Sequence, residues 1–123
     1  MARTRTEPGT PQPGRPVRGS RSGRPIMAAL DLLGRRWALR VLWELRGGPL
    51  TFRALRDASE GVSPSVLNTR LRELQESRIV EKTDAGYGLT AHGTSLCESL
   101  APLDRWARSW ARSEARRSKA ADS

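Results

Sequence analysis

The chain has 123 residues, of which 37% are hydrophobic, so we expect one compact domain and no second folded unit. Lys and Arg outnumber Asp and Glu by 22 to 13, and this net charge of +9 predicts a polyanionic partner such as a nucleic acid. A single cysteine and a single histidine exclude a disulfide framework, a multi-thiolate metal site and the common nucleophile–base pairs, so neither an enzyme nor a cofactor is expected.

Residues 1–24 are rich in Pro and Gly and contain almost no apolar side chains, so they cannot bury enough surface to offset the entropy of ordering. We therefore expect a disordered basic arm here. It is either a solvated tail with no role or a non-specific contact with DNA. The basic excess lies in this arm and in residues 105–123, because residues 25–104 carry equal numbers of both signs.

Three short helices are predicted next. The first begins at Pro25 and ends at Gly34, and the second runs from about Trp37 to Arg46. Thr51 predicts the N-cap of a third, very short helix. The apolar stripes of these helices comprise Ile26, Ala29, Leu30, Leu33, Trp37, Val41, Leu42, Leu45, Phe52 and Leu55.

A longer helix is predicted from Pro64 to about Ser77, with Ser63 as its N-cap. Its buried stripe comprises Val66, Leu67, Leu71 and Leu74. The opposite face carries Ser65, Asn68, Thr69 and Arg72. Such side chains read base edges and phosphates in the major groove of DNA, so this is the candidate recognition helix. We assign Arg70 to packing or to backbone contacts.

Residues 79–83 and 87–90 are predicted as two strands of a compact hairpin around Asp84-Ala85-Gly86. A long helix capped by Thr90 follows, and its apolar residues recur at the spacing of a seam between two helices: Leu96, Leu100, Leu103, Ala107 and Trp110. Pro102 should kink this helix and limit it to a short clasp.

The expected fold class is therefore mainly α with a small β-hairpin (α+β): a winged helix-turn-helix domain with a C-terminal dimerisation helix. We expect this domain over residues 25–112, with the dimerisation helix starting at about residue 91. Residues 113–123 should form a flexible basic tail.

Four phrases occur in an order and spacing that together are specific: Leu33-Gly34-Arg35-Arg36-Trp37, Gly48-Pro49-Leu50-Thr51-Phe52, Val62-Ser63-Pro64 with Arg70-Leu71-Arg72-Glu73-Leu74, and Leu89-Thr90 with Gly93. Over residues 25–110 they resemble the HxlR family, a dimeric branch of the winged-helix regulators related to the MarR type. The resemblance implies a DNA-binding transcription regulator that acts as a homodimer.

The chain departs from the family pattern at three places. Arg24 stands where family members typically have a cysteine, which argues against redox or aldehyde sensing by that route. The hairpin is several residues shorter, so its reach towards DNA should be reduced. Ser77-Arg78-Ile79 replaces a turn that usually contains glycine, and a positive φ at Arg78 would cost about 1 kcal/mol.

These assignments define three candidate sites. The expected DNA-binding residues are Ser63, Ser65, Asn68, Thr69, Arg72, Arg53, Arg56 and Lys82. The expected dimerisation residues are Ile26, Leu30, Leu96, Leu100, Leu103, Trp106 and Trp110. Trp43, Trp106 and Trp110 are candidates for the wall of an effector pocket, with core or interface packing as the alternative. His92 is expected at the surface, and Cys97 as a small buried hydrophobe or a thiol sensor.

The function predicted is a repressor that binds a pseudo-palindromic DNA operator as a homodimer and responds to an unidentified small-molecule effector. The alternative is a winged-helix module that binds protein or RNA without recognising an operator. That alternative predicts an apolar, uncharged recognition face, whereas this face is polar and carries Arg72. No apolar run reaches the ~18 residues of a membrane-spanning helix, and no secretory leader is recognised, so we expect a cytoplasmic, nucleoid-associated protein without a membrane partner.

Overall fold

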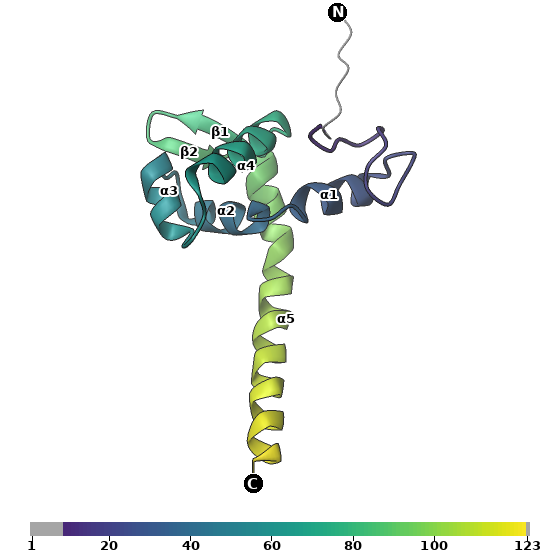
Figure 1. Ribbon diagram of the computed structural model, residues 1–123, viewed down its shortest axis with the longest axis vertical. Coiled ribbons are helices and arrows are strands. Elements are labelled where there is room, and N and C mark those ends of the chain that lie inside the picture. Colours follow the sequence, from purple (N-terminus) through teal and green to yellow (C-terminus); the bar gives the residue numbers. More distant parts are fainter. Residues whose placement is uncertain (1–8, 123) are drawn as a thin grey trace, which may run out of the picture.

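The computed structural model describes residues 9–122 as a small, mainly helical body from which one long helix projects (Figure 1). Within these residues no helix combines the length and the apolar character needed to cross a membrane. The elements in chain order are α1 (Pro25–Leu33), α2 (Ala38–Glu44), the 3-10 turn η1 (Leu45–Gly47), α3 (Phe52–Ala58), α4 (Pro64–Glu76), β1 (Val80–Thr83), β2 (Gly86–Leu89) and α5 (Ala91–Ala121).

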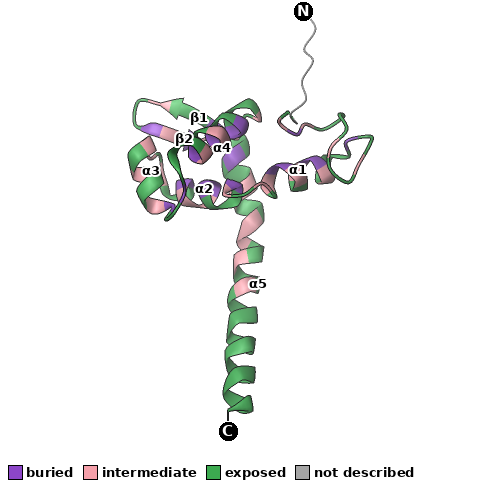
Figure 2. Ribbon diagram, in the orientation of Figure 1, coloured by how far each residue is buried: buried purple, intermediate pink, exposed green. Residues whose placement is uncertain are grey.

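The core lies between α2, α3, α4 and the hairpin, where Figure 2 shows most of the buried residues. Leu67, Leu71 and Leu74 of α4 are at most 1% exposed, as their helical spacing predicts. They pack in the same cluster as Leu45 and Leu55, which follow the predicted stripes of the two preceding helices. Helical periodicity thus places α4 with one face in the core and the other towards solvent.

The hairpin forms the wing. Strands β1 and β2 are antiparallel, with Val80 opposite Leu89 and Thr83 opposite Gly86, so Gly86 lies in the strand and not in the predicted turn. Leu50 adds a third extended segment through two backbone hydrogen bonds of 2.8 and 2.9 Å with Tyr87. The predicted winged helix-turn-helix architecture is confirmed.

Helix α5 is longer than predicted. Thr90 caps it as expected, since its hydroxyl accepts a hydrogen bond of 3.1 Å from the Gly93 amide. The helix continues through Pro102 to Ala121, so the short clasp and the flexible tail over 113–123 are both wrong as far as residue 121. Proline removes only one backbone donor, and residues 111–121 consist largely of strong helix formers.

Residues 9–24 form a folded loop beside α1, so the expected disordered arm is wrong for this part of the chain. The Gly14 amide donates to the Gly23 carbonyl at 2.9 Å, and Val17 pairs with Ser20 in an isolated bridge. Local hydrogen bonds of this kind, together with the buried Pro11, hold the loop, and composition alone does not indicate them. The part of the predicted arm over residues 1–8 lies outside the described residues.

Candidate nucleic-acid interface

Both ends of α4 are fixed by local hydrogen bonds. At its start the Ser63 hydroxyl accepts from the Val66 amide at 3.2 Å, so the predicted N-cap is confirmed. At its end the Arg78 amide donates to the Gln75 carbonyl at 3.0 Å, and the Ile79 amide donates to Leu74 at 2.9 Å, which is the Schellman pattern. Arg78 has φ 59° there, as anticipated for a turn that lacks glycine.

The outward face of α4 is accessible. Ser65, Asn68 and Arg72 are exposed, and the side chain of Arg72 keeps 60% of its surface accessible. Its guanidinium lies 3.7 Å from Glu76, an exposed pair that adds little stability and leaves the cation available. Thr69 is half-buried, and its hydroxyl donates to the Ser65 carbonyl at 3.0 Å. The predicted recognition face is therefore polar and open, with Arg72 as its cation.

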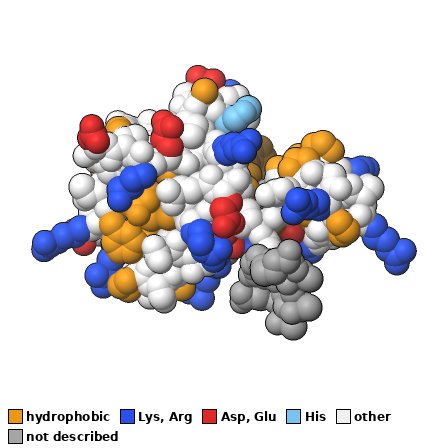
Figure 3. All heavy atoms as spheres, turned by 90° about the horizontal axis from the view of Figure 1, so that it is seen from above, with side chains coloured by type: hydrophobic (Ala, Val, Ile, Leu, Met, Phe, Trp, Pro, Cys, Tyr) orange, Lys and Arg blue, Asp and Glu red, His pale blue; other side chains and the backbone are white. Residues whose placement is uncertain are grey.

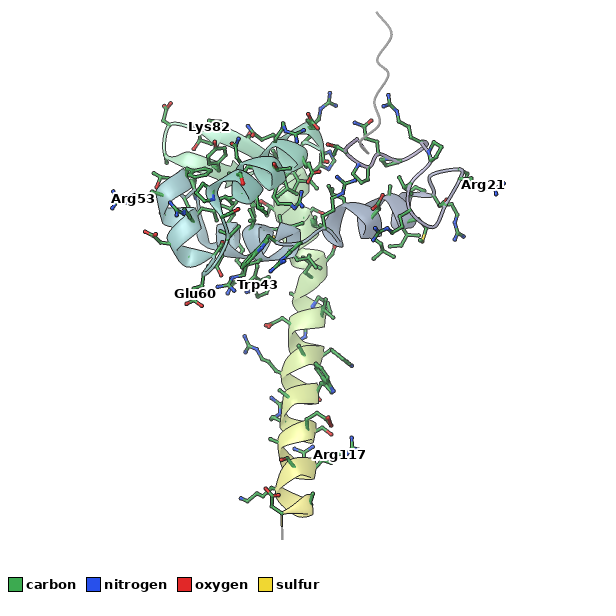
Figure 4. All side chains as sticks on the ribbon, in the orientation of Figure 1. Arg21, Trp43, Arg53, Glu60, Lys82 and Arg117 are labelled. Carbon is green, nitrogen blue, oxygen red and sulfur yellow. The ribbon has the colours of Figure 1, made fainter. Side chains whose placement is uncertain are left out.

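Three further cations predicted to contact DNA are exposed on neighbouring elements. Arg53 and Arg56 lie on α3, beside Asp57 and Glu60 around a shallow hollow. Lys82 lies on β1, with its ammonium 4.7 Å from the centre of the Tyr87 ring. Figure 4 shows Arg53 and Lys82 on the side of the body away from α1. Figure 3 shows that Lys and Arg side chains are spread over the face opposite the α5 tail.

A buried carboxylate on the inward side of α4 was not predicted. Glu73 is 5% exposed and forms ion pairs with Arg35 and Arg70, the latter at 2.7 Å. Arg70 Nε also donates to the Arg36 carbonyl at 2.6 Å, so the predicted packing role of Arg70 is confirmed. The sequence contained one signal, because Glu73 follows Val66 by two helical turns and so continues the edge of the buried stripe. This network fixes the linker between α1 and α2 against the recognition helix.

The predicted dimerisation residues form an apolar surface on α1 and α5. Ile26, Leu30, Leu103, Trp106 and Trp110 are each 53–61% exposed, and the two tryptophan rings stack with centroids 5.3 Å apart. Leu96 and Leu100 are half-buried, and Leu39 is exposed on α2 although it was not predicted. On α1 the face that enters the core was not predicted, because it carries Ala28 and Leu32. Of the predicted stripe, Ile26 and Leu30 are exposed, and Ala29 and Leu33 are half-buried. Their role in dimerisation stays a prediction.

Of the three tryptophans predicted to wall an effector pocket, only Trp43 lines a groove. Trp43 lines a groove of about 300 Å³ between α2 and α5, together with Leu39, Leu100, Leu103 and Ala107. Trp106 and Trp110 do not line this groove, although Asp104 and Ala107 of the same helix do. Figure 4 shows Trp43 where α2 approaches α5.

A cation adjoins Trp43, and a thiol on α5 faces the preceding residue of α2. The Arg46 guanidinium lies 3.9 Å from the centre of the Trp43 ring, a cation–π contact. The Cys97 thiol is half-buried, with its Sγ 3.8 Å from the Leu42 carbonyl. Burial raises the pKa of Cys97, and the positive charge of Arg46 offsets part of this rise. The thiol thus packs as a small hydrophobe in a setting that disfavours the reactive thiolate.

An N-capped helix with an open polar face, preceded by a short helix and followed by a hairpin, defines a winged helix-turn-helix protein of the DNA-binding type. The chain belongs to the HxlR-like helix-turn-helix family, whose profile matches residues 32–115. The relatives are transcriptional regulators, so the chain is an HTH-type transcriptional regulator and not an enzyme.

Individual relatives agree with this placement. YodB of Bacillus subtilis, an HTH-type transcriptional regulator, is 31% identical over 87 residues, which cover 65% of this chain and 78% of YodB. The quinone-bound crystal structure of YodB gives a TM-score of 0.65 at 32% identity, covering 69% of this chain and 97% of that one. A MarR-family regulator from Enterococcus faecalis gives a TM-score of 0.65 at 29% identity, covering 75% and 90%.

Proposed function

We propose that this regulator is a cytoplasmic homodimeric repressor that binds a pseudo-palindromic DNA operator. The observation that carries the proposal is the pairing of two exposed surfaces on one chain: the polar face of α4 and the apolar surface of α1 and α5. The first suits the major groove of DNA, and the second suits another copy of the same chain. Occupancy of a promoter would then repress transcription by exclusion.

The dimer follows from the geometry of α5. A helix of 31 residues is about 46 Å long, and Figure 2 shows that its outer part contacts nothing in its own body. Trp106 and Trp110 there are more than half exposed, which is unusual for aromatic residues of a monomer. A two-fold axis along α5 would present two copies of α4 to half-sites roughly 10–10.5 bp apart.

We further propose that a planar apolar effector binds in the groove beside Trp43. The indole and three leucines provide an apolar wall, and Arg40 with Asp104 provides a polar rim. An occupant would shift α2 relative to α5 and so change the spacing of the recognition helices. Menadione, a planar quinone, should quench the tryptophan fluorescence saturably; Trp43→Leu should weaken this binding and Trp37→Phe should not. Unchanged binding by Trp43→Leu would place the effector elsewhere.

Selection of bound sequences from a random duplex pool tests the central proposal. We expect enrichment of an inverted repeat, because each half-site of a two-fold dimer reads the same sequence. Enrichment of a single half-site would contradict the dimeric arrangement. Failure to retain any duplex, with binding to RNA or protein instead, would favour the alternative module.

A gel-shift titration with the selected operator tests the role of α4. Arg72→Ala should weaken specific binding by about 1–3 kcal/mol. Arg108→Ala is the matched control, because Arg108 and Arg72 both form exposed i,i+4 pairs, with Asp104 at 3.0 Å and with Glu76 at 3.7 Å. Equal affinities of the two variants would remove Arg72 from the recognition surface.

A further inference from the structure

A basic cleft lies between the N-terminal loop and the back of α4. It encloses about 870 Å³, within the size range of ligand sites. The loop over residues 9–18 forms one wall, and the linker between α1 and α2 forms the other, with Arg70 of α4 at its edge. The charged residues that line it are Arg15, Arg18, Arg35, Arg36, Arg70 and Asp31. Five arginines and one aspartate therefore line the cleft.

Two of these arginines have an anionic partner elsewhere. Arg35 and Arg70 both pair with the buried Glu73, which holds them in place and compensates part of their charge. Among residues 9–122, no carboxylate pairs with the guanidinium groups of Arg15, Arg18 or Arg36. Arg35 and Arg70 are thus fixed by a carboxylate, whereas Arg15, Arg18 and Arg36 have no carboxylate partner among the described residues.

The loop that carries Arg15 and Arg18 is built to hold its shape. The Arg18 amide donates to the Asp31 carboxylate of α1 at 3.2 Å, so the side chain of Arg18 is not needed for this contact. Gly23 closes the loop with φ +70°, and a Cβ there would lie 2.1 Å from the Arg15 carbonyl oxygen. Glycine is therefore required for the close approach that sets the cleft wall.

We propose that this cleft is a phosphate-binding site that extends the DNA contact of α4 along the sugar–phosphate backbone. Guanidinium groups bind phosphate oxygens in a bidentate manner, and a net excess of cations in a preformed cleft favours a polyanion. The cleft also borders the recognition helix: Arg70 of α4 lines it. Thr10, which lines the cleft as well, hydrogen-bonds to Glu76, the residue that pairs with Arg72 on the recognition face. The choice of DNA as the phosphate source depends on the proposed function.

The salt dependence of operator binding tests this proposal on the full chain. Each phosphate contact contributes about 0.9 to the slope of log K against log salt concentration. Arg15→Ala/Arg18→Ala removes two such contacts from each protomer, so the slope for a dimer on its operator should fall by about 3.6. Arg112→Ala/Arg116→Ala is the charge-matched control, because both arginines are exposed on the outer part of α5. The control should retain the slope, and both variants should keep the same preferred sequence.

A charge-neutral pair of variants tests the geometry. Gly23→Ala keeps every cation and distorts the loop, whereas a Cβ at Gly47 meets nothing within 4 Å. We expect Gly23→Ala to reduce the slope and Gly47→Ala to leave it unchanged. A wild-type slope in Gly23→Ala would show that the preformed wall is not required, and would overturn the site as described.

Titration calorimetry with inorganic tripolyphosphate distinguishes the sources of phosphate. Arg15→Ala/Arg18→Ala could leave the salt slope of DNA binding unchanged and still abolish tripolyphosphate binding. That result would assign the cleft to a free anion and would overturn the proposal that it contacts DNA. Unchanged slopes together with no tripolyphosphate binding would overturn the cleft altogether while leaving the operator proposal intact. Should the wild-type chain bind no duplex, the operator proposal fails, and the tripolyphosphate titration alone decides the cleft.

Discussion

Glu73 is the residue that joins α4 to the linker between α1 and α2. Its carboxylate accepts from two guanidinium groups whose side chains are themselves only 18% and 19% exposed. Removing one partner of such a network leaves the other charges without compensation. We expect Glu73→Gln to lower the free energy of unfolding by about 3 kcal/mol in urea denaturation.

The control for this substitution is Glu114→Gln. Glu114 forms an exposed pair with Arg117 at 3.6 Å on the outer part of α5, and such pairs contribute less than about 1 kcal/mol. Equal losses in the two variants would show that the charge of Glu73 does not stabilise the packing of α4.

Cys97 provides a second test at the level of one side chain. Burial raises the pKa of this thiol, and Arg46 lowers it in part. The folded chain therefore holds the thiol proton to higher pH than the unfolded chain does, so stability is full below the pKa of the unfolded thiol and falls as pH rises above it. We expect iodoacetamide to alkylate Cys97 more slowly in the folded protein than in urea, and more slowly still in Arg46→Ala. Equal rates in the folded and unfolded chains would contradict this environment.

At the scale of elements, the end of α4 carries a specific conformational cost. Arg78 occupies the left-handed position of a Schellman motif, where glycine avoids the steric penalty of a Cβ. Arg78→Gly should therefore raise the free energy of unfolding by up to about 1 kcal/mol. Gln75→Gly, in the exposed last turn of the same helix, should lower it by about the same amount. Destabilisation by Arg78→Gly in thermal unfolding would mean that the arginine side chain compensates for its backbone.

Elements with local signals could be predicted from the sequence. The Ser63 cap and the stripe from Leu67 to Leu74 depend on residues a few positions apart, and both are confirmed. The missing glycine raised the question of a positive φ at Arg78, and the residue does have φ 59°. Helical spacing places Glu73 at the edge of the buried stripe, but its partner Arg35 is 38 residues away, so no local pattern predicts the ion pair that accompanies its burial. The outer part of α5 lacks a stop signal, and its composition fits both a solvated tail and a continued helix.

In the candidate interface, too, features set by neighbouring residues could be predicted and features set by distant residues could not. The open face of α4 follows from helical periodicity, so Ser65, Asn68 and Arg72 could be placed correctly. The cleft behind α4 could not, because it needs the loop over residues 9–24 to fold back. That loop is ordered by the hydrogen bond between Gly14 and Gly23 and by the contact of Arg18 with Asp31, neither of which changes the composition of the segment.

At the scale of the whole molecule, association through α5 should depend on its apolar side. Leu103→Glu places a charge on the exposed stripe and should shift the protein from dimer to monomer in light scattering coupled to gel filtration. Arg105→Glu makes a larger change in charge on the opposite side of the same helix and should leave the dimer intact. A dimer that survives Leu103→Glu would have its interface elsewhere.

The folding of the projecting part of α5 should depend on protein concentration. A helix without tertiary contacts is only marginally stable in water, and every residue from 108 to 121 is exposed in a single chain. These residues should therefore fray when the chain is dilute and become helical when two chains meet. Far-ultraviolet circular dichroism should show that helix content rises with protein concentration. This rise should follow the same curve as the average molecular mass measured by light scattering. Residues 108–121 would then complete their folding only in the dimer, so a cell that holds few copies of the protein would hold few fully folded ones.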